Sequence, residues 1–119
     1  MFTQDQDCQY CSETQMLVEE VSALSENVHA EIIPFDPDET QALTYGIDKV
    51  PAIVVLSGDK TPRDYGIRYY GIPSGYEFTS LIEDIFMVAE GKSGLSADTQ
   101  EKLAALTTPV HLQVFVTPT

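Results

Sequence analysis

The sequence predicts an α/β protein with an α/β/α arrangement, in which helices cover both faces of a mixed β-sheet. Three observations predict it. Helical and strand patterns alternate along the chain, a Cys-x-x-Cys pair (Cys8 and Cys11) stands at the start of the first helical pattern, and Val50-Pro51 opens an apolar strand. With 119 residues, 43% of them hydrophobic, the chain is long enough for one domain with a real core.

The Cys-x-x-Cys pair holds the only two cysteines of the chain. Two intervening residues at the start of a helix let both sulfurs approach within disulfide geometry. Unpaired backbone N–H groups and the positive end of the helix dipole favour the thiolate there, which is the form that attacks a disulfide. We therefore predict that Cys8 is the nucleophile and Cys11 the resolving thiol.

Two other roles for the cysteine pair fit the sequence less well. A structural zinc site needs about four ligands, and His29 and His111 lie far from the pair without ligand-like spacing. An inert disulfide that closes so short a loop constrains the unfolded chain very little. The pattern therefore favours redox chemistry that uses neither a metal nor a cofactor.

The charge balance excludes several partners. The net charge is −13, from 19 acidic and 6 basic side chains, whereas nucleic acids and anionic lipids need basic patches. No apolar run approaches the roughly 18 residues of a membrane span, and the first five residues lack the features of a signal peptide. A single close cysteine pair fits a reducing compartment, so we predict a cytoplasmic protein.

The first half of the chain is expected to contain five elements. Phe2 and Thr3 form the remnant of a strand that enters the cysteine loop. A strand over 28–35, a short helix that ends at Gly46 and a buried strand after Pro51 follow the first helix. The apolar stripe of the first helix is predicted to comprise Leu17, Val18, Val21 and Leu24.

The second half is expected to begin with a strand over 67–72, antiparallel to the strand before it because the connection is too short for a crossover. A capping box over 74–77 then opens a helix that ends at Gly91, and Ser96 caps a shorter helix whose Leu103 and Leu106 face inward. Residues 110–116 alternate as a strand. The buried stripe of the longer helix is predicted to comprise Phe78, Leu81, Ile82, Ile85, Phe86 and Ala89.

Three motifs carry a resemblance to a known family. The segments 8–14, 45–52 and 69–75 resemble the first unit of the glutaredoxin-like protein disulfide oxidoreductases of archaea and thermophilic bacteria. Those proteins carry two thioredoxin-fold units in tandem. The resemblance implies a thioredoxin/glutaredoxin-like fold with a redox unit over 1–91, a connecting helix over 92–109, and a strand over 110–119 that would begin a second unit.

The resemblance also implies a mechanism and partners. The first cysteine attacks a protein disulfide and the second resolves the mixed disulfide, with an unidentified reductase as electron donor. The glutathione signature is incomplete, since Gly71 and Gly75 are present without the contiguous Gly-Gly and following aspartate. Protein disulfides are therefore favoured over glutathione adducts. The implied groove comprises Gln9, Tyr10, Lys49, Val50 and the cis-proline Pro51.

Charges near the nucleophile bear on its reactivity. Asp5, Asp7 and Glu13 flank Cys8 and should disfavour its thiolate, in opposition to the helix dipole. Lys49 is the cation expected to offset them. The balance predicts a reductase or a mild exchanger.

The short first strand raises a structural question, because it is central in such a sheet. An empty central position would leave backbone groups unpaired on two neighbouring strands. We hypothesise that Val110–Val116 fills this position, within one chain or by exchange between two chains in a homodimer. The alternative is that this segment pairs at an edge of the sheet.

Three functions follow from these patterns. The first is a thiol–disulfide oxidoreductase that acts through a mixed disulfide at Cys8. The second is a redox-inactive binding module of thioredoxin shape. The third is an iron–sulfur carrier in which Cys8 from two copies holds a [2Fe–2S] centre.

Overall fold

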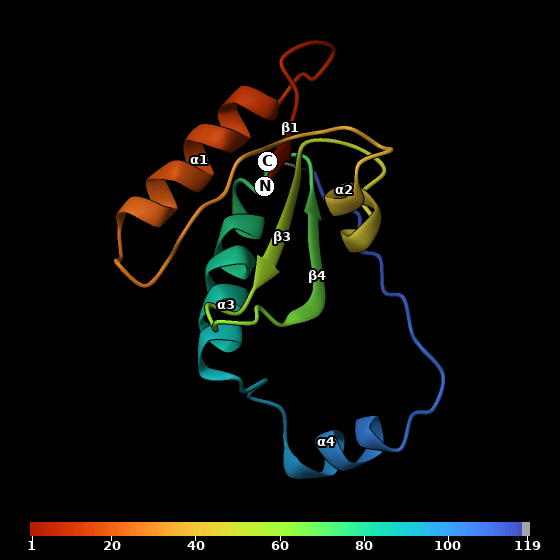
Figure 1. The fold of residues 1–119 in the computed structure, drawn as a ribbon. Coiled ribbons are helices and arrows are strands. Elements are labelled where there is room, and N and C mark those ends of the chain that lie inside the picture. Colours follow the sequence, from red (N-terminus) through yellow and green to blue (C-terminus); the bar gives the residue numbers. More distant parts are fainter. Residues whose placement is uncertain (118–119) are drawn as a thin grey trace.

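The structure, a computed structural model, describes residues 1–117. It contains four strands: β1 (Phe2–Thr3), β2 (Ile33–Pro34), β3 (Ala52–Leu56) and β4 (Asp64–Tyr70). It also contains four helices: α1 (Cys11–Ala23), α2 (Thr40–Tyr45), α3 (Tyr76–Glu90) and α4 (Ala97–Ala104). Strands and helices are arranged as the predicted mixed α/β fold (Figure 1).

The sheet has the strand order β2-β1-β3-β4, so the two-residue strand β1 is central. It runs parallel to β2, with Phe2 opposite Ile33, and antiparallel to β3, with Phe2 opposite Ala52. Strands β3 and β4 are antiparallel, as their short connection predicts. The central strand therefore places the start of the cysteine loop next to the start of β3.

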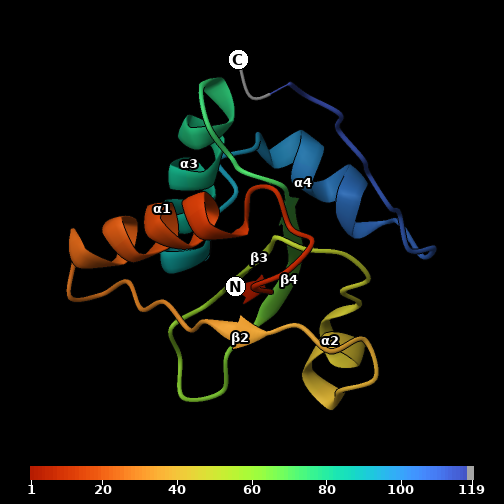
Figure 2. The ribbon, with the colours of Figure 1, turned by 90° about the horizontal axis from the view of Figure 1, so that it is seen from above.

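Two cores lie on opposite faces of the sheet, because successive strand residues point to opposite faces. Helices α1 and α3 cover one face and α2 the other (Figure 2). The first core contains Met1, Ile53, Val55, Tyr69, Leu81 and Val88. The second contains Phe2, Ala42, Ile47 and Ala52.

The buried stripes of the two long helices are narrower than predicted. In α1, Leu17, Val18 and Val21 pack toward the sheet, but Leu24 is 81% exposed because the helix ends at Ala23. In α3, the residues that face the core are Leu81, Ile85 and Val88. Since each helical residue turns by about 100°, Phe86 and Ala89 fall off this stripe and are exposed.

The strand predicted over 28–35 is only two residues long. Its length is limited by its partner, because β1 offers few residues to pair with. The N–H of Ile33 donates to the carbonyl of Met1, and the N–H of Phe35 to that of Thr3, both at 2.8 Å. Residues 28–32 therefore lie outside the sheet.

Helix ends follow the sequence more closely. Gly46 and Gly91 adopt left-handed conformations at the ends of α2 and α3, as predicted. The side chain of Ser96 accepts from the N–H of Thr99 at 3.2 Å and caps α4. The capping box at 74–77 was misplaced, because the N-cap of α3 is Gly75.

The C-terminal part differs most from prediction. Helix α4 ends at Ala104, and Leu103 and Leu106 are about half exposed instead of facing inward. Residues 110–117 form no strand, and Figure 2 shows them along the outside of the molecule, past α4. The last two residues of the strand predicted over 110–119 lie outside the described residues.

The hypothesis that Val110–Val116 fills the central position within one chain is therefore wrong. Strand β1 occupies that position and bonds to both of its neighbours. A strand-exchanged homodimer stays a prediction, as do the proposed boundaries at 91 and 109. Within residues 1–117, no helix is long and apolar enough to cross a membrane.

Candidate redox site

The two cysteines form a disulfide at the amino end of α1. Cys11 is the first residue of the helix and Cys8 lies in the loop before it, with 5.5 Å between their Cα atoms. The two are not equally accessible. Cys11 is only 2% exposed, whereas Cys8 is half-buried. An incoming sulfur can therefore approach Cys8 more readily than Cys11.

A buried threonine ties the cysteine loop to the helix. The side-chain hydroxyl of Thr14 donates to the carbonyl of Tyr10 at 2.6 Å, and its backbone N–H donates to the same oxygen at 2.9 Å. Thr14 is completely buried. Sequence reasoning missed this residue, although a polar side chain three positions after Cys11, among the inward-facing positions of the helix, was the available signal.

The loop also contains an unusual backbone conformation. Asp7 has φ 55°, in the left-handed region, which costs residues other than glycine energy but is tolerated best by Asp and Asn. This conformation immediately precedes Cys8. The loop therefore combines a sharp local turn at Asp7 with the anchored carbonyl of Tyr10.

A pocket opens beside the disulfide. Both cysteines line it, together with residues from the end of β1 and from one side of α1. Two carboxylates, Asp5 and Glu19, line it as well, and no lysine, arginine or histidine does. An exchanging sulfur would therefore enter an acidic environment. The remaining lining residues are Thr3, Gln4, Ser12, Gln15 and Met16.

The Val50–Pro51 peptide bond is cis, as the resemblance implies. Because Phe2 pairs antiparallel with Ala52, Thr3 and Pro51 lie at the same end of the sheet, where the cysteine loop departs. The carbonyl of Pro51 accepts from the N–H of Gly71 at 2.9 Å. Within residues 1–117, the backbone N–H and carbonyl of Val50 make no hydrogen bond.

The other predicted groove residues are near the surface. Tyr10 is 39% exposed, and the side-chain amide of Gln9 donates to its hydroxyl at 3.3 Å. Lys49 lies 2.5 Å from the carboxylate of Asp48 and 4.4 Å from the centre of the Tyr70 ring. The hydrogen bond to Asp48 raises the pKa of Lys49.

These contacts correct one expectation. The positive charge of Lys49 is engaged with Asp48 and Tyr70, and Lys49 does not line the pocket that holds Cys8. It is therefore poorly placed to offset the carboxylates around the cysteine. Among residues 1–117, no group of three or more His, Cys, Asp or Glu side chains is arranged to hold a metal ion.

Comparison with known proteins finds a likeness to a solved structure. No family model and no curated protein matches the sequence. The structure is similar to that of AhpF, a component of the alkylhydroperoxide reductase of Enterococcus faecalis (V583), solved as a cysteine-to-alanine mutant, with a TM-score of 0.74 and 30% sequence identity. The match covers 87% of this chain and 49% of that chain, so this chain spans about half the length of its neighbour.

This likeness identifies the fold as thioredoxin-like. Together with the disulfide between Cys8 and Cys11, it indicates thiol–disulfide redox chemistry.

Proposed function

We propose that this chain is a thiol–disulfide oxidoreductase that acts on protein disulfides, with Cys8 as the attacking thiol and Cys11 as the resolving thiol. One observation carries the proposal: an accessible cysteine and a buried one are joined at the amino end of α1, beside an open pocket. A structural disulfide has no need of such a pocket or of unequal access to its two sulfurs.

The exchange conserves sulfur bonds and transfers two electrons. In the reduced protein, the Cys8 thiolate attacks one sulfur of the substrate disulfide, and the other substrate sulfur leaves as a thiolate that takes up a proton. The Cys11 thiolate then attacks the sulfur of Cys8 and releases the second substrate thiol. The protein ends as the Cys8–Cys11 disulfide, and a dithiol donor regenerates it by the reverse steps.

The substrate chain is proposed to lie across the cis bond. An extended backbone can add to the free N–H and carbonyl of Val50, as peptides add to an exposed strand. Pro51 shapes this end of β3, while Gln9, Tyr10 and Lys49 supply exposed side chains around it. This arrangement supports protein substrates, because small disulfides lack a backbone to pair with.

We also propose the finer relationship to the archaeal glutaredoxin-like oxidoreductases, with residues 1–91 as the redox unit. The motifs around the cysteine pair and the cis-proline support it. The half-length match to the Enterococcus faecalis protein is compatible with a tandem arrangement that begins again after residue 109.

The test is insulin reduction with dithiothreitol as electron donor. Cys8→Ser should abolish the activity, because the remaining thiol, Cys11, is buried and cannot reach the substrate. Cys11→Ser should accumulate mixed disulfides with insulin, which non-reducing gels and mass spectrometry detect. Circular dichroism checks that both variants fold. Activity that survives Cys8→Ser would refute the proposal, and a folded wild-type protein without any exchange would favour the binding-module interpretation.

A further inference from the structure

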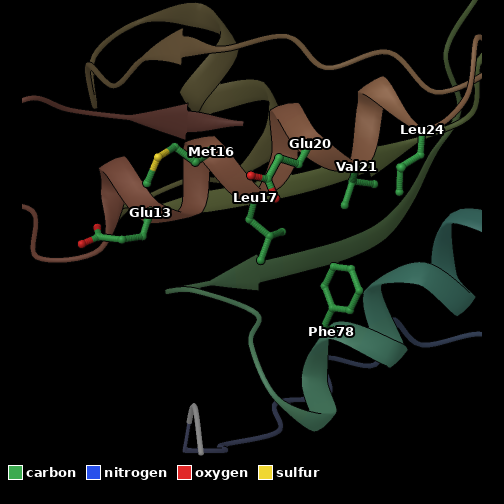
Figure 3. A pocket seen from close by; sticks show the side chains of 7 residues that line it. All are labelled: Glu13, Met16, Leu17, Glu20, Val21, Leu24 and Phe78. Carbon is green, nitrogen blue, oxygen red and sulfur yellow. The ribbon is translucent and has the colours of Figure 1, made fainter.

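A second groove lies between α1 and the start of α3, distinct from the pocket beside the disulfide. Its apolar part is formed by Leu17 and Val21 of α1 and by Phe78 of α3. Figure 3 shows Leu17 and Val21 pointing toward Phe78, which projects from α3 toward α1. Leu24, 81% exposed, closes one end of the groove. An apolar surface of this kind is suited to hold apolar side chains of a partner.

The groove adjoins the pocket of the redox site at one residue. Met16 lines both the groove and the pocket that contains Cys8 and Cys11. Its side chain is 52% exposed, and the flexible thioether of methionine adapts to differently shaped partners. A protein whose disulfide reaches Cys8 would therefore have its neighbouring residues over the groove.

The charges around the groove have one sign. Glu13 and Glu20 line it, Asp5 and Glu19 line the adjoining pocket, and no lysine, arginine or histidine lines either. The same asymmetry extends over the surrounding chain. Residues 1–48 carry eleven of the nineteen acidic residues and no lysine or arginine. A cationic partner is attracted to such a surface and an anionic one is repelled.

We infer that the groove between α1 and α3 binds an apolar segment bearing lysine or arginine, in the protein whose disulfide is exchanged at Cys8. The inference rests on the proposed function and names its substrate class. Glu13 and Glu20 are seven residues apart on α1, about 10 Å along the helix. An extended chain rises about 3.3 Å per residue, so cations three positions apart would meet both carboxylates.

The probes are two synthetic peptides, each with one internal disulfide. One carries the tail Lys-Leu-Leu-Lys and the other Glu-Leu-Leu-Glu. Stopped-flow measurement gives the second-order rate constant with which each peptide oxidises the reduced protein, and hydroxyethyl disulfide serves as an uncharged reference. The basic peptide should react about three- to tenfold faster than the acidic one at low salt. This advantage should vanish near 1 M salt, where the screening length is about 3 Å.

Variants locate the effect. In Glu20→Gln and in Leu24→Ser, the ratio of the basic-peptide rate to the hydroxyethyl disulfide rate should fall about two- to fivefold, the size expected for one partly exposed contact. Glu101→Gln is the matched control. It removes the same charge from an exposed position on α4 and should leave the ratio unchanged.

The outcomes separate this inference from the proposed function. Two results would overturn the inference that the groove binds a basic segment, provided that hydroxyethyl disulfide still reacts. These are equal ratios in Glu20→Gln and Glu101→Gln, and no preference of the wild type for the basic peptide. Failure of hydroxyethyl disulfide and of both peptides to oxidise the dithiol would overturn both. A wild-type dimer in sedimentation that Leu24→Ser dissociates would instead assign the groove to a second copy of the chain.

Discussion

Two segments of the chain look alike in sequence and behave in opposite ways. Phe2-Thr3 and Phe115-Val116-Thr117 each combine a phenylalanine with a nearby threonine, and both were predicted to be strands. Phe2 is 2% exposed in the centre of the sheet, whereas Phe115 is 90% exposed. The segment with the longer alternating pattern is therefore the one without a strand.

A strand forms only where neighbouring strands offer hydrogen-bond partners. Strand β1 bonds to β2 on one side and to β3 on the other, so two residues acquire partners on both edges. The alternating segment over 110–116 has seven residues but pairs with no strand, and residues 100–117 are all exposed. The radius of gyration is accordingly 15.1 Å, against about 13.5 Å for a compact chain of this length.

Truncation of the buried phenylalanine should have the strongest effect on stability. Phe2→Ala should lower the free energy of unfolding by about 3–5 kcal/mol, because it leaves a cavity next to Ala42 and Ala52 in a close-packed core. Urea denaturation measures it. Phe115→Ala is the control and should change stability by less than about 0.5 kcal/mol. Equal losses in the two variants would mean that the C-terminal segment is buried in solution.

The same comparison shows what sequence could predict. The cysteine pair at the start of α1 and the glycine ends of α2 and α3 were predictable, because each depends on a few adjacent residues. The strand over 28–35 shrank because its length depends on β1, which lies thirty residues away. The strand predicted from alternation over 110–116 is absent for a related reason. An alternating pattern indicates which side chains would share a face of a strand, but it does not supply a neighbouring strand to pair with.

The candidate site divides in a similar way. Sequence and family resemblance located Cys8, Cys11 and the cis-proline. They missed the anchoring role of Thr14, because the sequence does not reveal whether a hydroxyl on a helix faces solvent or a backbone carbonyl of the preceding turn. They also misjudged Lys49, whose contact with Tyr70 of β4 depends on the fold.

A buried tyrosine gives the second prediction. The hydroxyl of Tyr69 on β4 donates to Asp84 of α3 at 2.5 Å, and burial together with this bond raises the pKa of Tyr69. Tyr69→Phe should cost about 1–3 kcal/mol at neutral pH, because the Asp84 carboxylate loses its donor. Tyr76→Phe, at a side chain that is 91% exposed, is the control and should be nearly neutral.

The raised pKa of Tyr69 also sets the direction of a pH effect. The unfolded chain releases this proton near its ordinary pKa of about 10, before the folded protein does. The bond therefore contributes stability that is present below about pH 10 and is lost as the pH rises further. Urea titrations between about pH 9 and about pH 11 should show a shallower fall in Tyr69→Phe than in the wild type. An identical alkaline slope would contradict this assignment.

The third prediction concerns the cysteine loop that follows β1. Thr14→Val removes the hydroxyl that donates to Tyr10 and keeps the shape of the side chain, so it should cost about 0.5–1.5 kcal/mol. Thr79→Val makes the same change on the exposed side of α3 and should cost less. Thermal unfolding compares the two variants. A larger loss of stability in Thr79→Val would contradict the anchoring role of Thr14.

Removal of residues 106–119 should change stability least. Helix α4 has no buried residue, and the segment after it lies exposed outside both cores, so a chain that ends at Ala105 should keep its free energy of unfolding within about 0.5 kcal/mol. Its insulin reduction should also be unchanged, because none of residues 106–117 lines the disulfide pocket or the groove beside α1.

A loss above about 2 kcal/mol would contradict the exposed position of these residues, since removal of exposed residues rarely has such an effect. Its dependence on protein concentration would then identify the cause. A loss that grows with the concentration of the intact chain would show that residues 110–116 pair with a second copy, because only binding between chains makes stability depend on concentration. A loss independent of concentration would show that they pack on their own chain, and Phe115→Ala should then share it.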